Sequence, residues 1–402
     1  MEKVDKIYSS IDYIQAFRKQ LKLKDYESTI IIAIKTADLF LKIIEVKRYS
    51  NLEELLQIIK IVGKMFITVD LMQFSVGNIV KRILYFINQE KSKVILSVDK
   101  SKSIITLNSL LINHNLAKED PTNTYLTSVN VDSNSNYNYY NSFKDKKVCK
   151  FANTIENNSN NNDIKYNSTN KVNKYNFEES IENIIEKISS LITTLESTSE
   201  EINKLSEEHI MQDDIILTSN YSGQLLEFLI EASKTKKFHI IVAESLPSAS
   251  GLLMAEKLIK ANIQTTIIND SAIFAVIPRV NKVIIGTRAI MANGGLISYN
   301  GVYNICLSAQ TYAIPVLVIS GTFKLTPMYP FDHETFNEQL SPDKVLSGVS
   351  DENLENISFN SPAYDYIPPD LITLFITDSG SQNPSYMYRL FNECFSQEDY
   401  FL

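Results

Sequence analysis

Short apolar runs alternate with longer amphipathic segments from about residue 213 onward. The apolar runs, rich in Ile and Val, predict strands at residues 215–218, 239–243, 265–268, 283–286, 316–319 and 371–376. The segments between them suit helices at residues 223–232, 250–260, 271–277 and 302–312, with a closing helix at 384–394. Strands joined by single helices pair in parallel, and their non-alternating apolar character favours burial on both faces. Residues 213–402 are therefore predicted to form a doubly wound α/β domain.

The first part of the chain has a helical periodicity instead. Residues 8–115 carry few strand signals, and Asn51 is a candidate N-cap for an apolar stripe that continues through Ile61. Residues 75–89 predict a further helix. From Asn176 to Glu208 apolar residues recur every three or four positions, which is typical of one long amphipathic helix. We therefore expect a helical domain at residues 1–117 and a connecting helix at 176–212.

Residues 118–175 lie between these two helical parts and differ from both in composition. The segment is rich in Asn, Ser and Tyr, contains the run NNSNNN at 157–162, and has little aliphatic content. Such a composition buries too little apolar surface to offset the entropy of ordering the chain. We predict a disordered insertion over this segment.

Composition narrows the classes of function. The 402 residues include 39 basic and 47 acidic ones, a net charge of −8, so the overall basic footprint of a nucleic-acid-binding protein is missing. No apolar run is long enough to span a bilayer, and the opening MEKVDKIYSS is unlike a signal peptide. We predict a cytoplasmic protein with no membrane partner and no direct nucleic-acid partner.

The sequence also lacks the short motifs of several enzyme classes. GxGxxG, GxxxxGK[ST] and GxSxG are all absent, which argues against dehydrogenases, P-loop nucleotide hydrolases and serine hydrolases. The three cysteines, Cys149, Cys306 and Cys394, are far apart, and the four histidines are scattered. We predict no cofactor, no metal site and no disulfide framework.

Polar residues do follow several predicted strands, at the sheet edge where such folds bind ligands. Asp270 is either a general acid or base facing a ligand, or a helix N-cap, and Glu244 allows the same two interpretations. The stretch Asn293-Gly294-Gly295 either holds a phosphate with its backbone amides or is an ordinary turn. These residues alone leave both sets of alternatives open.

Several stretches of the chain carry a resemblance to a known family. They read TIINDSAIF at 266–274, VNKVIIGTR at 280–288, YDYIPPDLITLF at 364–375 and PSYMYRL at 384–390. Together they resemble the regulatory subunits of eukaryotic translation initiation factor 2B, whose α/β domain is shared by related sugar-phosphate isomerases. FHIIVAE at 238–244, FKL at 323–325 and FSVGNIVKR at 74–82 are most similar to the beta subunits. The resemblance implies an α/β fold in which an N-terminal helical bundle precedes a Rossmann-like doubly wound parallel sheet.

The same resemblance implies a site that has lost its chemistry. The isomerases carry a catalytic cysteine where this chain has Asn220, and Asp270 matches their catalytic aspartate. An amide supplies neither a thiolate nor an acidic proton donor. Arg288 stands where the isomerases usually have an acid, and a pair between Arg288 and Asp270 that closes the old pocket is a further hypothesis. We expect a remnant ligand pocket formed by Asn220, Tyr221, Asp270, Arg288, Asn293 and Gly294.

Finally, the resemblance implies partners. A beta subunit pairs with delta, assembles with alpha, gamma and epsilon, and helps to bind the alpha subunit of initiation factor 2, whose phosphorylation the assembly senses. We therefore expect a non-catalytic regulatory subunit of the guanine-nucleotide exchange factor for factor 2. Asp213 and His239 are candidate subunit contacts, although a simple packing role for His239 is equally open. The alternative function is an active aldose–ketose isomerase of the same fold, whose cysteine requirement position 220 does not meet.

Overall fold

The structure is a computed structural model that describes residues 12–23, 28–46, 49–70, 72–93, 165–329, 337–341 and 358–395, the side chains of 165–176 excepted. Contacts divide the chain into two compact units, one of Met1–Gln89 with Ile181–Leu402 and one of Glu90–Ser180. The first unit holds both the helical bundle and the α/β part. The predicted domain boundaries stay predictions, because residues 94–164 lie outside the described ranges.

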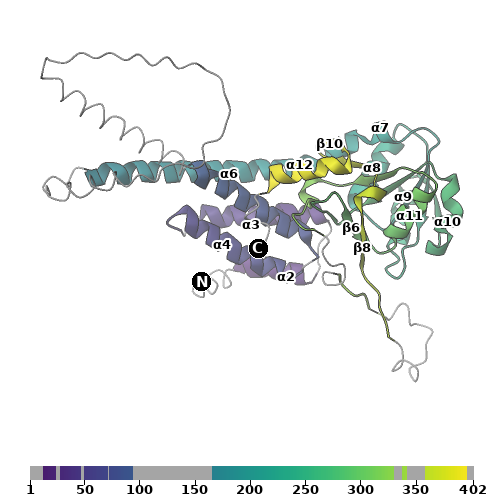
Figure 1. Cartoon of the computed structure of the whole chain (residues 1–402), viewed down its shortest axis with the longest axis horizontal. Helices are drawn as coiled ribbons and strands as arrows, with labels where there is room; N and C mark the ends of the chain where they lie inside the picture. Colours follow the sequence, from purple (N-terminus) through teal and green to yellow (C-terminus); the bar gives the residue numbers. More distant parts are fainter. Residues whose placement is uncertain are drawn as a thin grey trace, which may run out of the picture. The chain divides into compact units, whose positions relative to one another are not determined.

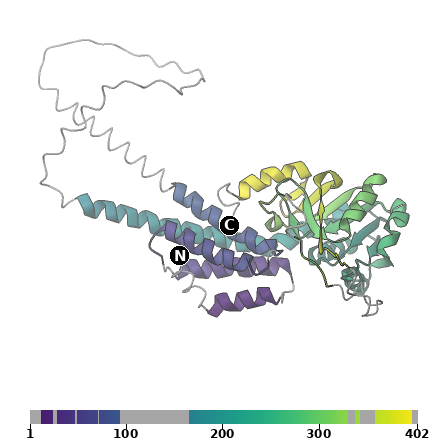
Figure 2. The same ribbon diagram turned by 60° about the horizontal axis from the view of Figure 1, so that its bottom comes forward.

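The N-terminal helices pack around an apolar core. They are α2 (Asp12–Lys22), α3 (Thr29–Glu45), α4 (Leu52–Ile67) and a helix at residues 74–93 (Figures 1 and 2). The predicted N-cap of α4 is confirmed, because the side chain of Asn51 accepts a hydrogen bond of 2.8 Å from the backbone N–H of Glu54. Phe66 is buried in this core and makes edge-on contacts with Phe17 and Phe40.

The long connecting helix begins earlier than predicted. α6 spans Lys165–Lys204, so it starts inside the segment predicted as a disordered insertion, and that part of the prediction is wrong. The prediction rested on apolar spacing, and the regular apolar pattern of this helix begins at Ile181. The residues before it extend the same helix without adding to that apolar pattern. The insertion's residues 118–164 lie outside the described part of the chain.

A seven-stranded sheet, ordered β10-β9-β7-β4-β1-β2-β3, forms the centre of the α/β part. Its strands are β1 (Ile215–Ser219), β2 (His239–Ala243), β3 (Gln264–Ile268), β4 (Lys282–Gly286), β7 (Val316–Ile319), β9 (Leu374–Thr377) and β10 (Gly380–Gln382). Neighbouring strands pair in parallel except β10, which returns antiparallel to β9. The chain winds outward from β1 to β3 and then crosses to β4 on the other side of β1, so the predicted doubly wound sheet is confirmed. This switch point lies between β1 and β4.

Two details of the predicted strands are wrong. The sequence predicted burial of β3 on both faces, but β3 is an edge strand whose side chains are exposed or half-buried. Thr265 and Thr266, both β-branched, suit a strand whether or not it is covered, so composition did not reveal the edge. The last strand begins at Leu374 instead of residue 371, because Pro369–Leu371 form a 3-10 turn.

A second, three-stranded antiparallel sheet was not predicted. It consists of β5 (Ala289–Ile290), β6 (Leu296–Tyr299) and β8 (Tyr364–Ile367), in the order β5-β6-β8. Its apolar side chains form a small core with Met72 and Phe74, the residues around the start of the helix at 74–93. This sheet therefore joins the helical bundle to the α/β part.

Helices cover both faces of the seven-stranded sheet (Figure 1). On one face, α8 (Gly223–Ser233) and α9 (Ser250–Lys260) bury Phe228 and Met254. On the other, α10 (Ile273–Val276), α11 (Val302–Thr311) and α12 (Pro384–Cys394) bury side chains that include Cys306 and Phe391. The predicted bounds of α9 and α12 agree with the structure.

Candidate functional site

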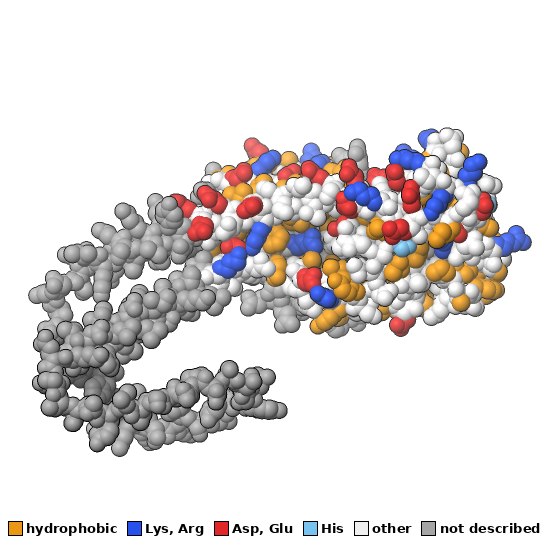
Figure 3. Space-filling view, turned by 90° about the horizontal axis from the view of Figure 1, so that it is seen from above, with side chains coloured by type: hydrophobic (Ala, Val, Ile, Leu, Met, Phe, Trp, Pro, Cys, Tyr) orange, Lys and Arg blue, Asp and Glu red, His pale blue; other side chains and the backbone are white. Residues whose placement is uncertain are grey.

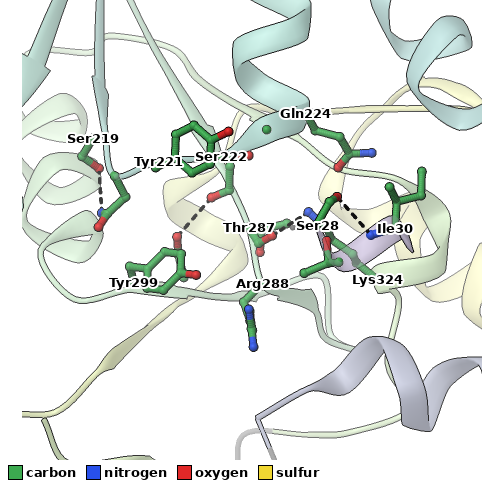
Figure 4. Close-up of a pocket in the computed structure, with 15 residues that line it drawn as sticks. Ser28, Ile30, Ser219, Tyr221, Ser222, Gln224, Thr287, Arg288, Tyr299 and Lys324 are labelled. Carbon is green, nitrogen blue, oxygen red and sulfur yellow. Dashed lines mark hydrogen bonds between the residues drawn. The ribbon is translucent and has the colours of Figure 1, made fainter. Parts of the chain in front are cut away.

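A pocket of about 200 Å³ lies at the carboxyl ends of β1 and β4, at the switch point of the sheet. The loops after these strands, the first turns of α3 and α8, and a 3-10 turn at Thr322–Lys324 line it. Figure 4 shows Ser219 and Tyr221 on one side of the pocket and Gln224, Ser28 and Lys324 on the other. Residues from the helical bundle and from the α/β part therefore share one site.

Lys324 is the most unusual side chain of this pocket. The residue is 4 % exposed, and its Nζ donates a hydrogen bond of 3.0 Å to the backbone oxygen of Thr287. Burial, and next the charge of Arg288, lower the pKa of Lys324 to about 7. No described residue that lines the pocket carries a carboxylate, so none of them stabilises the protonated amine by an ion pair. In the sequence, Lys324 stands out only as part of the FKL stretch at 323–325, which does not reveal its place in this pocket.

Helix N-termini add positive potential to the same pocket. Ser28 caps α3 by accepting from the N–H of Ile30 at 3.3 Å, and Ser222 caps α8 by accepting from Leu225 at 3.4 Å. Gly286 permits the close approach of β4 to this cap, because a Cβ there would lie 2.7 Å from the side chain of Ser222. The positive ends of both helix dipoles thus face a pocket that already holds two basic residues, an arrangement that favours anions.

Gln224, at the start of α8, is a second residue that the sequence analysis missed. Both polar atoms of its side-chain amide are buried, and neither has a hydrogen-bond partner. An unpaired buried amide is costly, about 1–3 kcal/mol, unless a ligand or water completes its hydrogen bonds. A buried glutamine beside a helix cap has no sequence signature, so only the fold could reveal it.

Asn220 and Tyr221 both line the pocket, as expected. Asn220 is buried in the left-handed conformation with φ 56°, which suits asparagine. Its backbone N–H donates to Ser245 Oγ at 3.0 Å, and its Oδ1 accepts from Ser250 Oγ at 2.8 Å. The half-buried Tyr221 packs against the core beneath α8. Asn220 therefore connects the end of β1 to the segment that follows β2.

Arg288 lines the pocket, but Asp270 does not. Asp270 accepts hydrogen bonds from the backbone N–H groups of Ser245 at 3.0 Å and Leu246 at 2.8 Å. The proposed Arg288–Asp270 pair is therefore wrong: each carboxylate oxygen of Asp270 binds the loop after β2, while Nε of Arg288 donates to the carbonyl of Met72 at 3.1 Å. Asp270 is not an N-cap either, because it is the first residue of the 3-10 turn Asp270–Ala272, whose N-cap position is Asn269.

Asn293 and Gly294 lie outside the pocket lining. They form the turn between β5 and β6, where Asn293 accepts from the N–H of Gly295 and donates to the hydroxyl of Tyr366. A Cβ at Gly294 would lie 2.6 Å from the backbone oxygen of Pro384, so α12 already occupies that side of the turn. The turn interpretation is thus favoured over the phosphate cradle. Glu244 is half-buried and does not line the pocket.

Neither of the two cysteines that the structure describes lines this pocket. Cys306 is fully buried in α11, and burial raises the pKa of its thiol to about 12, as expected for a packing residue. Cys394 is half-buried at the end of α12, where its Sγ accepts from Arg82 at 3.0 Å. Cys149 lies outside the described residues.

Asp213 and His239 lie at the opposite, amino-terminal ends of the strands. Both line a separate hollow of about 550 Å³ together with Asn262 and Gln264. Asp213 is exposed, and His239 is half-buried with its Nε2 at 2.9 Å from the hydroxyl of Thr266. They are therefore accessible on the surface but remote from the pocket.

A group of large apolar side chains is exposed around the edge strand. Their exposed fractions lie between 42 % and 56 %, and they come from the loop after β2, from α9, from β3 and from α10: Leu246, Leu252, Leu253, Ile259, Ile267 and Phe274. We call this the edge-strand surface. Phe274 extends it toward α11, since its ring lies 5.4 Å from that of Tyr312. Large apolar side chains that are exposed on neighbouring elements favour a protein–protein contact.

Other classes of site have little support among the described residues. None of their helices is long and apolar enough to cross a membrane. No group of three or more of their His, Cys, Asp and Glu side chains could hold a metal ion. Acidic and basic side chains are mixed over the face seen in Figure 3, with no continuous basic field among the residues described there.

Comparison with known proteins places these features in a family. The model of the initiation factor 2 subunit family matches residues 26–384. The chain is 35 % identical to the translation initiation factor eIF2B subunit beta of Dictyostelium discoideum, covering 96 % of this chain and 95 % of that protein. It is 32 % identical to the beta subunit of Schizosaccharomyces pombe over 94 % of each. A ribose 1,5-bisphosphate isomerase of Archaeoglobus fulgidus is 29 % identical over only 57 % of this chain.

Solved structures agree on the fold. The crystal structure of eIF2B beta from Chaetomium thermophilum is similar with a TM-score of 0.65 and 20 % identity, covering 100 % of this chain and 98 % of that one. A chain of the tetrameric eIF2B beta2-delta2 complex of the same organism is similar with a TM-score of 0.61 and 20 % identity, covering 95 % and 94 %. At these identities the structures show the shared fold.

Proposed function

Because this chain belongs to the initiation factor 2 subunit family, we propose that it is a non-catalytic regulatory subunit of the guanine-nucleotide exchange factor for translation initiation factor 2. The similarity to beta subunits covers nearly the whole chain, whereas that to the isomerase covers little more than half. The proposed work of the subunit is assembly and recognition in the cytoplasm.

The observation that carries the non-catalytic part is the state of Asn220. An amide cannot act as a nucleophile or an acid. Here the side-chain oxygen of Asn220 binds Ser250, at the start of α9, and its backbone N–H binds Ser245, in the loop after β2. Asp270, which the resemblance matches to the catalytic aspartate of the isomerases, binds two backbone N–H groups. A proton relay between these two positions would require both to leave their present partners. These contacts support a degenerate isomerase site.

The edge-strand surface supports an assembly role. Six large apolar side chains of neighbouring elements are each at least 42 % exposed, which favours a partner that removes them from water. We propose that a delta-type subunit covers this surface, as the two kinds of chain occur together in the beta2-delta2 complex of C. thermophilum. Asp213 and His239 remain candidate contacts at the rim, where the hollow at the amino ends of β1–β3 begins.

The remaining partners follow from the same proposal. Alpha, gamma and epsilon subunits would join the assembly, and the alpha subunit of initiation factor 2 would bind it differently when phosphorylated, because a phosphate adds negative charge and strong acceptors. Neither a membrane nor a direct nucleic-acid contact is needed for this function.

The test is co-purification with a co-expressed delta subunit of the same organism. Ile267→Asp and Phe274→Asp each place a charge at an exposed position of the edge-strand surface, so we expect both to abolish a stable complex. Tyr388→Asp is the matched control, because Tyr388 is 55 % exposed on α12, away from that surface. Complex formation that survives both substitutions would rule out this surface as the contact.

A second assay separates the two functions. The purified chain is incubated with ribose 1,5-bisphosphate. The formation of the ketose is followed by chromatographic separation of the two isomers, which have the same mass. We expect no turnover. Catalytic formation of the ketose by the chain alone would refute the regulatory proposal in favour of the isomerase.

A further inference from the structure

We propose that Lys324 is an amine nucleophile that forms a reversible imine with small aldehydes carrying an anionic group, which enter the pocket between β1 and β4. This inference goes beyond the regulatory function and does not depend on it. It concerns a covalent modification site, and it uses neither Asn220 nor Asp270.

The position of Lys324 in the pocket is the first observation that supports imine formation. Its side chain is almost completely buried yet lines a pocket of about 200 Å³, so a small molecule there would meet the amine (Figure 4). The Nζ makes one described hydrogen bond, to the oxygen of Thr287, and lies 5.8 Å from the centre of the Phe323 ring. No described carboxylate lines the pocket, so the amine lacks the ion pair that normally keeps a lysine charged.

The electrostatic surroundings supply the second argument. Burial and the neighbouring Arg288 bring the pKa of Lys324 to about 7, whereas an ordinary lysine titrates near 10.4. At neutral pH much of Lys324 would therefore be the free amine, the form that attacks a carbonyl. Lysines made nucleophilic by burial or by a second cation are a known basis of imine chemistry.

The remainder of the pocket selects the ligand. The N-termini of α3 and α8 face it, and both helices are long enough, at 17 and 11 residues, to carry a dipole. Gln224 adds a buried amide whose donor and acceptor atoms both lack a partner. These groups favour a phosphate or carboxylate together with a hydroxyl or carbonyl. The pocket volume limits the aldehyde to a small molecule.

The chemistry is balanced without an oxidant or reductant. The lone pair of Nζ attacks the carbonyl carbon and a C–N bond forms, while one proton passes from the nitrogen to the carbonyl oxygen to give a carbinolamine. The hydroxyl group then leaves together with the second N–H proton as one water, which gives the C=N bond. The net reaction joins one amine and one aldehyde and releases one water, and hydrolysis reverses it.

The experiment traps the imine. The full chain is incubated with glyceraldehyde 3-phosphate at pH 7.5, reduced with borohydride, digested and mapped by mass spectrometry. We expect labelling of Lys324 at least about tenfold above that of the exposed lysines Lys204, Lys234 and Lys260, each of which is paired with a glutamate that favours the charged amine. Unphosphorylated glyceraldehyde should label Lys324 no better than it labels the exposed lysines. Labelling confined to exposed lysines would overturn the proposal.

Two controls make the result specific. Lys324→Arg removes the amine and forms no imine under these conditions, so labelling at position 324 should vanish while labelling of the exposed lysines stays unchanged. The melting temperature of this variant shows whether it folds. If this variant fails to fold, competition replaces it: inorganic phosphate should protect Lys324 in the unmodified chain and leave the exposed lysines unchanged. Equal labelling of Lys324 by the two aldehydes, or no protection by phosphate, would contradict the anionic requirement.

Discussion

Nε of Arg288, just after β4, donates a hydrogen bond of 3.1 Å to the backbone oxygen of Met72, which precedes the helix at residues 74–93. The guanidinium also lies 6.0 Å from the ring of Tyr364, on β8. One side chain thus ties the loop at the pocket to the helical bundle and to the small sheet. Its role is to join parts of the molecule, and it is not paired with Asp270.

Replacing this arginine should loosen the joint. We expect Arg288→Ala to lower the free energy of unfolding by about 1–3 kcal/mol, because a buried carbonyl loses a charged donor. Arg389→Ala is the control, since the Arg389–Glu393 pair is exposed on α12 and its loss should change stability by no more than about 0.5 kcal/mol. Urea unfolding of both variants measures the difference. Equal stability of the two would show that Arg288 does not stabilise the contact between these parts of the molecule.

The pH dependence of the stability should reflect the titration of Lys324. Its folded pKa of about 7 lies below the unfolded value of about 10.4, so between these pH values the unfolded chain binds more protons than the folded one. By linkage, this group stabilises the fold progressively as pH rises from 7 toward 10, by at most about 1.4 kcal/mol per pH unit, and that gain is lost as pH falls to 7. The free energy of unfolding of Lys324→Met, relative to that of the wild type, should therefore fall as pH rises. Parallel unfolding curves against pH from 7 to 9 would show that Lys324 stays charged in the fold.

The carboxylate of Asp270 should matter for the loop after β2. Asp270→Asn keeps only one oxygen for the two N–H groups of Ser245 and Leu246, so we expect a loss of about 1–3 kcal/mol. Asp213→Asn is the matched control, because Asp213 is exposed with φ 62°, a conformation that asparagine tolerates. Thermal unfolding measures the stability of both variants. Equal losses in the two would show that the hydrogen bonds of Asp270 to the loop after β2 do not account for the effect.

Placing the cysteine of the isomerases at position 220 should not create an enzyme. Asn220→Cys supplies a thiol, but Asp270 remains bound to two backbone N–H groups, and the hydrogen bond from Ser250 is lost. Cysteine is also less suited to φ 56° than asparagine, so a destabilisation of about 1–2 kcal/mol is expected. The measurement is ketose formation from ribose 1,5-bisphosphate. Turnover by this single variant would mean that Asp270 is available as a proton carrier, contrary to its contacts.

Much of the fold could be predicted because its signals are local. The cap at Asn51 and the bounds of α9 and α12 depend on residues within a few positions, and the structure bears them out. The edge position of β3 could not be predicted, since the same β-branched sequence suits a covered or an open strand. The small sheet escaped prediction because β6 and β8 pair across more than sixty intervening positions, as in the Tyr299–Tyr364 register.

The candidate site divides in the same way. Asn220, Tyr221 and Arg288 were expected from a family pattern and do line the pocket, whereas Asp270, Asn293 and Gly294 do not. Ser28, Gln224 and Lys324 were not expected there, because they come from segments far apart in the chain. Residue types and their local spacing alone determined the helices and the parallel strands, and the resemblance to the isomerases implied the missing thiol at position 220. Only the tertiary structure decided that a lysine is buried without a carboxylate, since its environment depends on which distant backbone and side-chain atoms surround it after folding.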